Sequence, residues 1–249
     1  MIIVDPSDYI EIGNLLAAEG VPLEFRRRLA AKAFQHIAVY DTVISAYLRV
    51  NDSSLKEKSS FFPEELTFGW NRVATPRYGE NPHQAGGIYA TPGKKGGIVN
   101  AKQLHGIDMS YLNYFDADAA GVSANSFSLI ASDQEHCVSI VKHANPWGLA
   151  IDGDQPEAYL KALQETRDQH LGYCRFNSKV TVETAEAMVG TLFDVIVAPG
   201  FEHEALEIFR RRKRTRVIEV RPSSVPLLTV RNVTGGVLVP KNPMKSLKM

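Results

Sequence analysis

Cysteine is nearly absent from this chain of 249 residues, which contains only Cys137 and Cys174. Because they are far apart and form no CxxC pair, the sequence predicts neither a disulfide framework nor a zinc site. No other metal-ligand spacing is present, so we expect no bound metal. So few cysteines suit a reducing compartment.

Net charge is also absent, because 28 lysines and arginines balance 28 aspartates and glutamates. This excludes the overall positive charge of proteins that coat nucleic acids, although a local basic cluster can still bind a small anion. No segment approaches the roughly 18 apolar residues of a membrane helix, and the first residues lack the features of a signal peptide. We expect a soluble cytoplasmic protein with no nucleic-acid or membrane partner.

Apolar side chains at helical spacing predict two helices in the first fifty residues. Asp5 and Pro6 are a capping pair for the first helix, and Gly20 ends it. Pro22 opens a longer helix, whose apolar residues form one stripe that requires a partner surface: Phe25, Leu29, Ala33, Phe34, Ile37, Ile44 and Leu48. A polar, serine-rich linker over 51–64 then predicts a domain boundary, which divides the chain into 1–64 and 65–249.

Beyond residue 112 the pattern alternates between helices and strands. We expect helices over 116–130, 156–165, 181–192 and 202–212, and strands over 137–141, 171–177, 195–198 and 216–220. Short strands that alternate with helices of about ten residues indicate βαβ units. The predicted fold class is therefore α/β, with a sheet covered on both faces.

The densest group of polar side chains is the stretch RYGENPHQ at 77–84. Its arginine can bind a phosphate through two hydrogen bonds, its tyrosine and amides can hydrogen-bond a ligand, and its histidine can move a proton near neutral pH. Gly79 and Pro82 restrict the backbone that carries them. The alternative is a hydrogen-bonded surface turn, and composition alone does not decide between the two.

A second polar group, KHANPWG at 142–148, directly follows the apolar strand 137–141. Ligands of open α/β sheets bind outside the carboxyl ends of strands, which favours a functional role. Neighbouring strand residues point to opposite faces, so Lys142 and His143 can share a pocket only where the regular strand ends. Asn145 and Pro146 would end it. The alternative is a solvated lysine beside a buried, hydrogen-bonded imidazole.

Two other charged groups are interpreted structurally. The basic run 210–216 ends a predicted helix that begins with Glu202 and Glu204, so its charges complement the helix dipole. Asp116 and Asp118 are expected in the first turn of a helix, where carboxylates are favoured.

The two polar stretches resemble the most distinctive motifs of a family of bifunctional purine-biosynthesis enzymes, the AICAR transformylase/IMP cyclohydrolases. The segments 29–48, 103–120, 183–188 and 195–208 also resemble family segments, in family order. The resemblance implies that 1–64 corresponds to the end of the cyclohydrolase domain plus a linker. It further implies that 65–249 is the first subdomain of the transformylase region, a three-layer α/β/α, cytidine-deaminase-like unit.

The resemblance also implies a reaction, the transfer of a formyl group from 10-formyltetrahydrofolate to the 5-amino group of AICAR or a similar aminoimidazole ribotide. His143 would take the proton and Lys142 would act electrostatically. The remaining site residues would bind the substrate, with Arg77 and Tyr78 on the phosphate and Asn81, His83 and Asn145 on the ring and carboxamide.

A homodimer, or a separate chain that supplies the other half of the region, is expected to complete this site. Cyclohydrolase activity is not expected from this chain alone. The alternative is a non-catalytic nucleotide-binding or assembly module descended from the enzyme. It is motivated by Trp147, which stands where the family usually has cysteine, and by 168–172, where only Gly172 is kept from the family's SAFGG stretch.

Overall fold

The computed structural model describes residues 1–18, 20–51, 62–128, 132, 134–164, 166, 170–221 and 229–240. The chain forms two compact units, described separately below. The first contains Met1–Arg72 and Tyr89–Gly93, and the second contains Val73–Ile88 and Lys94–Met249. Among the described residues, no helix combines the length and the apolar character needed to cross a bilayer.

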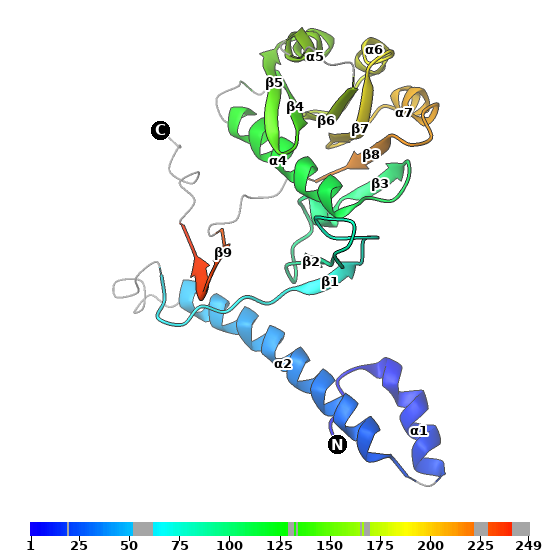
Figure 1. Cartoon of the computed structure of the whole chain (residues 1–249), viewed down its shortest axis with the longest axis vertical. Coiled ribbons are helices and arrows are strands. Elements are labelled where there is room, and N and C mark those ends of the chain that lie inside the picture. Colours follow the sequence, from blue (N-terminus) through cyan, green and yellow to red (C-terminus); the bar gives the residue numbers. More distant parts are fainter. Residues whose placement is uncertain are drawn as a thin grey trace. The chain divides into compact units, whose positions relative to one another are not determined.

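The first unit is built on two helices, α1 (Tyr9–Ala17) and α2 (Leu23–Asn51), as the sequence predicts (Figure 1). A short 3-10 helix, Pro6–Asp8, precedes α1, and the Asp5 side chain accepts a hydrogen bond of 2.8 Å from the backbone N–H of Ser7. Lys32 of α2 forms ion pairs with Asp5 and Asp8 at 2.6 and 2.7 Å. These contacts join α2 to the start of the chain.

The predicted apolar stripe of α2 is buried only at Leu29 and Ala33. Its other large side chains are exposed at Phe34, Ile37, Ile44 and Leu48, and Phe25 is half-buried. The described part of the unit thus covers only part of the stripe. The predicted linker lies mostly outside the described residues, at 52–61.

The second unit has a six-stranded sheet with the order β3-β8-β7-β6-β4-β5. Its strands are β3 (Lys102–His105), β4 (His136–Lys142), β5 (Asn145–Asp152), β6 (His170–Phe176), β7 (Leu192–Ala198) and β8 (Arg216–Glu219). Strands β6, β7 and β8 are parallel, whereas β3, β4 and β5 each pair with their neighbours in antiparallel fashion. The α/β class is confirmed, with a mixed sheet.

Helices cover both faces of this sheet, which gives three layers (Figure 1). On one face, Ile140, Cys174 and Ile196 pack against α5 (Gln155–Gln164), α6 (Val182–Ala187) and α7 (His203–Arg210). On the other, Val141, Val195 and Val197 pack with Ala117 and Ala120 of α4 (Tyr111–Ser128). The alternation of apolar residues along each strand accounts for both cores.

Several details differ from the predictions. The helix predicted over 181–192 ends at Ala187, and Leu192 is the first residue of β7. The strand β5 was not expected, because Asn145 and Pro146 were interpreted as the end of a strand. Helix α4 begins at Tyr111 rather than near Asp116, so Asp116 and Asp118 lie inside the helix and not in its first turn. The predicted end of this helix, 129–130, lies outside the described residues.

Four short strands and a 3-10 turn complete the description. Strands β1 (Asn71–Ala74) and β2 (Ile88–Ala90) pair with each other, as do β9 (Arg231–Val233) and β10 (Gly236–Leu238). A 3-10 turn at Ile98–Asn100 places the buried Ile98 against the α4 side of the sheet.

Both cysteines are free and fully buried in the sheet. Burial raises the pKa of the Cys137 thiol to about 11 and raises the pKa of the Cys174 thiol well above its usual range. A thiol reacts as its thiolate, so both are protected at pH 8. We expect neither cysteine to react with a disulfide reagent such as Ellman's in the folded protein, and both to react in denaturant. Rapid reaction of either thiol before unfolding would contradict this packing.

Candidate functional site

One cavity of the second unit, of about 480 Å³, brings together residues from both polar motifs. This volume lies within the range of small-ligand pockets, roughly 300–1,000 Å³. Its lining residues are Arg77, Tyr78, Ile107, Ser110, Leu112, Asn113, Asp116, Lys142, His143, Gly172, Tyr173, Asp194, Arg214 and Arg216.

The cavity lies at one edge of the sheet, where strands of opposite direction meet. Lys142 is the last residue of β4, whereas Gly172, Asp194 and Arg216 lie in the first halves of β6, β7 and β8. The site is thus at the carboxyl end of β4 but at the amino ends of the parallel strands. The expectation that it lies outside carboxyl ends holds only for β4, because β4 runs antiparallel to β6.

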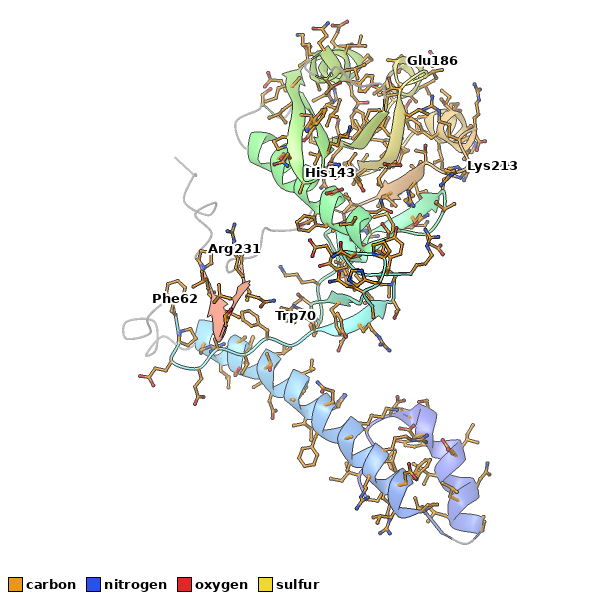
Figure 2. All side chains as sticks on the ribbon, in the orientation of Figure 1. Phe62, Trp70, His143, Glu186, Lys213 and Arg231 are labelled. Atoms are coloured by element: carbon orange, nitrogen blue, oxygen red, sulfur yellow. The ribbon has the colours of Figure 1, made fainter. Side chains whose placement is uncertain are left out.

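A two-residue turn lets Lys142 and His143 line the same space. Lys142 pairs with Asn145 across the β4–β5 hairpin, and the turn residues His143 and Ala144 have φ angles of 51° and 58°. Figure 2 labels His143 in this turn. Positive φ at both positions is typical of a type I′ turn, and it costs a residue with a side chain roughly 1–2 kcal/mol. Such strain often occurs at functional sites. The strand does become irregular after Lys142, but through this turn rather than through Pro146.

Asn145 supports the turn, because its side-chain amide donates a hydrogen bond of 2.9 Å to the backbone carbonyl of His143. Trp147 occupies a bulge in β5, since Val141 pairs with Pro146 and Ile140 pairs with Gly148. The Trp147 ring lies 4.7 Å from the Lys142 ammonium, which is a cation–π contact. The tryptophan therefore lies beside Lys142, close to the turn of the hairpin.

The RYGENPHQ loop is held together by its own hydrogen bonds. The backbone N–H of Gly79 donates to the Gln84 carbonyl at 2.7 Å, and the Gln84 side-chain oxygen accepts from the Asn81 backbone and side-chain amides at 3.0 and 3.3 Å. Arg77 and Tyr78 line the cavity from this loop. Asn81 and His83 are exposed and are not among the lining residues.

The start of α4 forms another wall of the cavity. The Ser110 backbone N–H donates to the Asn113 side-chain oxygen at 2.8 Å, and the Asn113 backbone N–H donates to the Ser110 hydroxyl at 3.2 Å. This reciprocal pair is a capping box. The Asn113 side chain also donates to the Tyr173 hydroxyl at 2.8 Å, which ties α4 to β6.

Burial, and to a smaller extent Asp116 and Asp194, raises the pKa of Tyr173 well above its usual range. Tyr173 is therefore a neutral hydrogen-bonding group in this wall. Asp116, which the sequence interpretation assigned to the helix dipole, lies here nearly buried. No polar motif marks Asp194, because it lies within the apolar strand β7.

The basic run 210–216 is divided between two environments. Helix α7 ends at Arg210, as expected for a run that complements a helix dipole. However, Arg214 and Arg216 line the cavity together with Arg77, so the interpretation of the whole run as a solvated helix end is wrong. Arg216, the first residue of β8, is buried, whereas Arg214 precedes the strand and is exposed.

Of the seven residues predicted for the site, the structure brings four together: Arg77, Tyr78, Lys142 and His143. Asn81, His83 and Asn145 lie in the adjoining turns outside the lining, and their predicted roles stay predictions. Gly172, the residue kept from the altered 168–172 stretch, lines the cavity, while 167–169 lie outside the described residues. No group of three or more potential metal ligands occurs within the described part of the chain.

The fold and the cavity define an α/β protein with a cation-rich small-ligand site. The family model for the AICARFT/IMPCHase bienzyme matches residues 1–248. The chain therefore belongs to the AICARFT/IMPCHase family.

Three relatives, each called bifunctional purine biosynthesis protein PurH, match 96% of the chain. The protein from Listeria welshimeri is 39% identical over 242 residues, that from Thermoanaerobacter 36% over 240, and that from Persephonella marina 38% over 245. The match covers 45%, 45% and 46% of these relatives, so the chain spans about half their length.

A solved structure, described as that of a candidate formate dehydrogenase accessory protein from Desulfotalea psychrophila, matches with a TM-score of 0.34 and 11% identity. The match covers 53% of this chain and 58% of that one, and a likeness this low carries no argument.

Proposed function

We propose that this chain takes part in purine biosynthesis by binding AICAR, or a similar aminoimidazole ribotide, and transferring a formyl group to its 5-amino group from 10-formyltetrahydrofolate. The observation that carries the proposal is the meeting of Arg77 and Tyr78 with Lys142 and His143 in one cavity. Family membership supports a substrate of purine biosynthesis, and a cavity of about 480 Å³ supports a small ligand.

The chemistry explains why a base and a cation are both needed. The lone pair of the AICAR amine is delocalised into the ring and carboxamide, so the amine is a weak nucleophile. His143 would accept its proton as the new carbon–nitrogen bond forms, and Lys142 would stabilise the oxyanion at the formyl carbon. The bond from the formyl carbon to N10 of the folate then breaks, and N10 takes up a proton to give tetrahydrofolate.

Substrate position would be fixed from the other side of the cavity. In this proposal Arg77 and Tyr78 bind the phosphate, while Asn81, His83 and Asn145 orient the ring and carboxamide after movement of their turns. A second copy of the chain, or a separate chain related to the remaining half of the relatives, would complete the folate site. The free, buried thiols are compatible with the proposed cytoplasmic location.

Replacing Arg77 with alanine is expected to weaken AICAR binding roughly 10- to 100-fold, because it removes a charge-assisted hydrogen-bonding group from the cavity. Isothermal titration calorimetry measures the change. Arg72→Ala is the matched control, since Arg72 is an exposed arginine of the other unit. Equal affinities in the two variants would argue against a nucleotide in this cavity.

Turnover tests the proposal directly. The purified chain, alone and with a chain that supplies the other half of the relatives, is mixed with AICAR and 10-formyltetrahydrofolate, and tetrahydrofolate release is followed. The proposal expects release in at least one of the two mixtures. No release in either mixture would overturn formyl transfer.

A non-catalytic nucleotide-binding module is the second candidate, and one observation favours it. Trp147 lies against Lys142, the residue proposed to act on the oxyanion. An aromatic ring in that place can hold the ammonium away from the formyl group. AICAR binding that depends on Arg77, without folate binding or tetrahydrofolate release, would support this candidate.

A further inference from the structure

Three guanidinium groups from two distant segments line one cavity. Arg77 belongs to the loop that follows β1, Arg214 to the connection before β8, and Arg216 is the first residue of β8. Lys142 adds a fourth cation, against the two carboxylates of Asp116 and Asp194. Leaving His143 aside, the lining therefore has two more cationic than anionic side chains, which favours an anionic ligand.

Arg216 has the features of a built binding group rather than of a solvated charge. The residue is 7% exposed, and its Nε donates a hydrogen bond of 3.1 Å to the backbone carbonyl of Asp108. Among the described residues, its two terminal nitrogens have no hydrogen-bond partner. A nearly buried arginine that lines a cavity and keeps N–H groups available can bind an anion through charge-assisted hydrogen bonds.

Arg77 and Arg214 lie close enough to Arg216 for their charges to act on it. Burial lowers the pKa of Arg216, and the charges of Arg77 and Arg214 lower it further, while Asp194 acts in the opposite direction. A bound anion would raise the pKa of Arg216 again, because its negative charge stabilises the charged guanidinium group.

The backbone that carries Arg216 is fixed by a close approach that only glycine allows. Gly106, after β3, has a φ of 95°, and a Cβ atom there would lie 2.3 Å from the Thr215 carbonyl oxygen and 2.8 Å from the Arg216 Cα. The Thr215 hydroxyl also donates to the Phe193 carbonyl at 3.0 Å. Arg216 is therefore held in place before any ligand binds.

We propose that Arg214 and Arg216, together with Arg77, bind the phosphomonoester of the ribotide as a dianion. The inference rests on the proposed function, which it deepens by naming the groups that select a 5′-phosphate. Planar guanidinium groups suit this task because each can form two parallel hydrogen bonds to phosphate oxygens.

The test compares AICAR with its nucleoside, which lacks the phosphate. Arg214→Gln should weaken AICAR binding about ten-fold or more by calorimetry, and leave nucleoside binding unchanged. Arg216→Lys keeps the charge but loses the planar fork, and should have the same selective effect. Lys213→Gln is the matched control, because Lys213 is exposed, adjacent in the run and outside the lining (Figure 2).

The outcomes separate this inference from the proposed function. If AICAR binds the unaltered chain and both cavity variants bind it as tightly as Lys213→Gln does, the inference is overturned and the proposed function stands. If AICAR does not bind, inorganic phosphate becomes the probe, and its effect on the melting temperature should be lost in Arg214→Gln and kept in Lys213→Gln. Absence of any phosphate effect would then overturn the inference as well. Circular dichroism verifies that each variant is folded.

Discussion

Replacing His143 with alanine is expected to reduce formyl transfer by roughly 10²- to 10⁴-fold, the usual contribution of a general base, while AICAR still binds. In the proposed reaction the imidazole of His143 accepts the amine proton, whereas other side chains bind the phosphate. Tetrahydrofolate release measures turnover, and calorimetry measures binding in the same preparation.

The turn at His143 calls for a second variant, since a loss in His143→Ala could follow from a displaced hairpin. His143→Asn is suitable because asparagine tolerates positive φ and cannot act as a base at neutral pH. It should keep the fold and still lose turnover. A variant with asparagine that transfers formyl groups at the normal rate would remove His143 from the mechanism.

Replacing Gly148 with alanine is expected to destabilise the protein by about 3 kcal/mol or more, because strand β5 passes directly against helix α5. A Cβ atom at Gly148 would lie 2.0 Å from the carbonyl oxygen of Ala162 and 2.9 Å from its carbonyl carbon. Backbone atoms cannot move aside as a side chain can, so the strand or the helix must shift. Urea unfolding followed by circular dichroism measures the change.

Gly153→Ala is the matched control for this prediction. Gly153 directly follows β5, and a Cβ atom there would meet nothing within 4 Å. The control should therefore change the free energy of unfolding by no more than about 0.5 kcal/mol. Equal midpoints for the two variants would show that β5 does not pack on α5 as described.

Much of the second unit could be predicted from apolar spacing. The buried strands β4 and β7 are strongly apolar, and their core residues leave little choice of structure. Strand β5 was missed because its turn is made of His143 and Ala144 and not of the asparagine and glycine usual in such turns. Pro146 also argued against a strand, since proline is tolerated in sheets only at edges and bulges. The proline fits here because β5 is an edge strand with a bulge.

The candidate site could be predicted only in part, for a similar reason. Arg77 and Lys142 stand out because each lies in a short stretch crowded with polar residues. Arg214 and Arg216 were hidden in a basic run, where local charge patterning cannot tell a helix end from the start of a strand. The position of Asp116 could not be predicted, because the start of α4 was not recognised. Ser110 and Asn113 form a capping box there without the usual glutamate or glutamine.

Because β4 runs antiparallel to β6, different parts of the sheet carry the residues on the two sides of the cavity. Arg216 lies at the start of the interior strand β8, whereas His143 lies in a strained hairpin at the margin of the sheet. In the proposed function, a change in the hairpin would therefore stop formyl transfer without removing the arginines that bind the nucleotide.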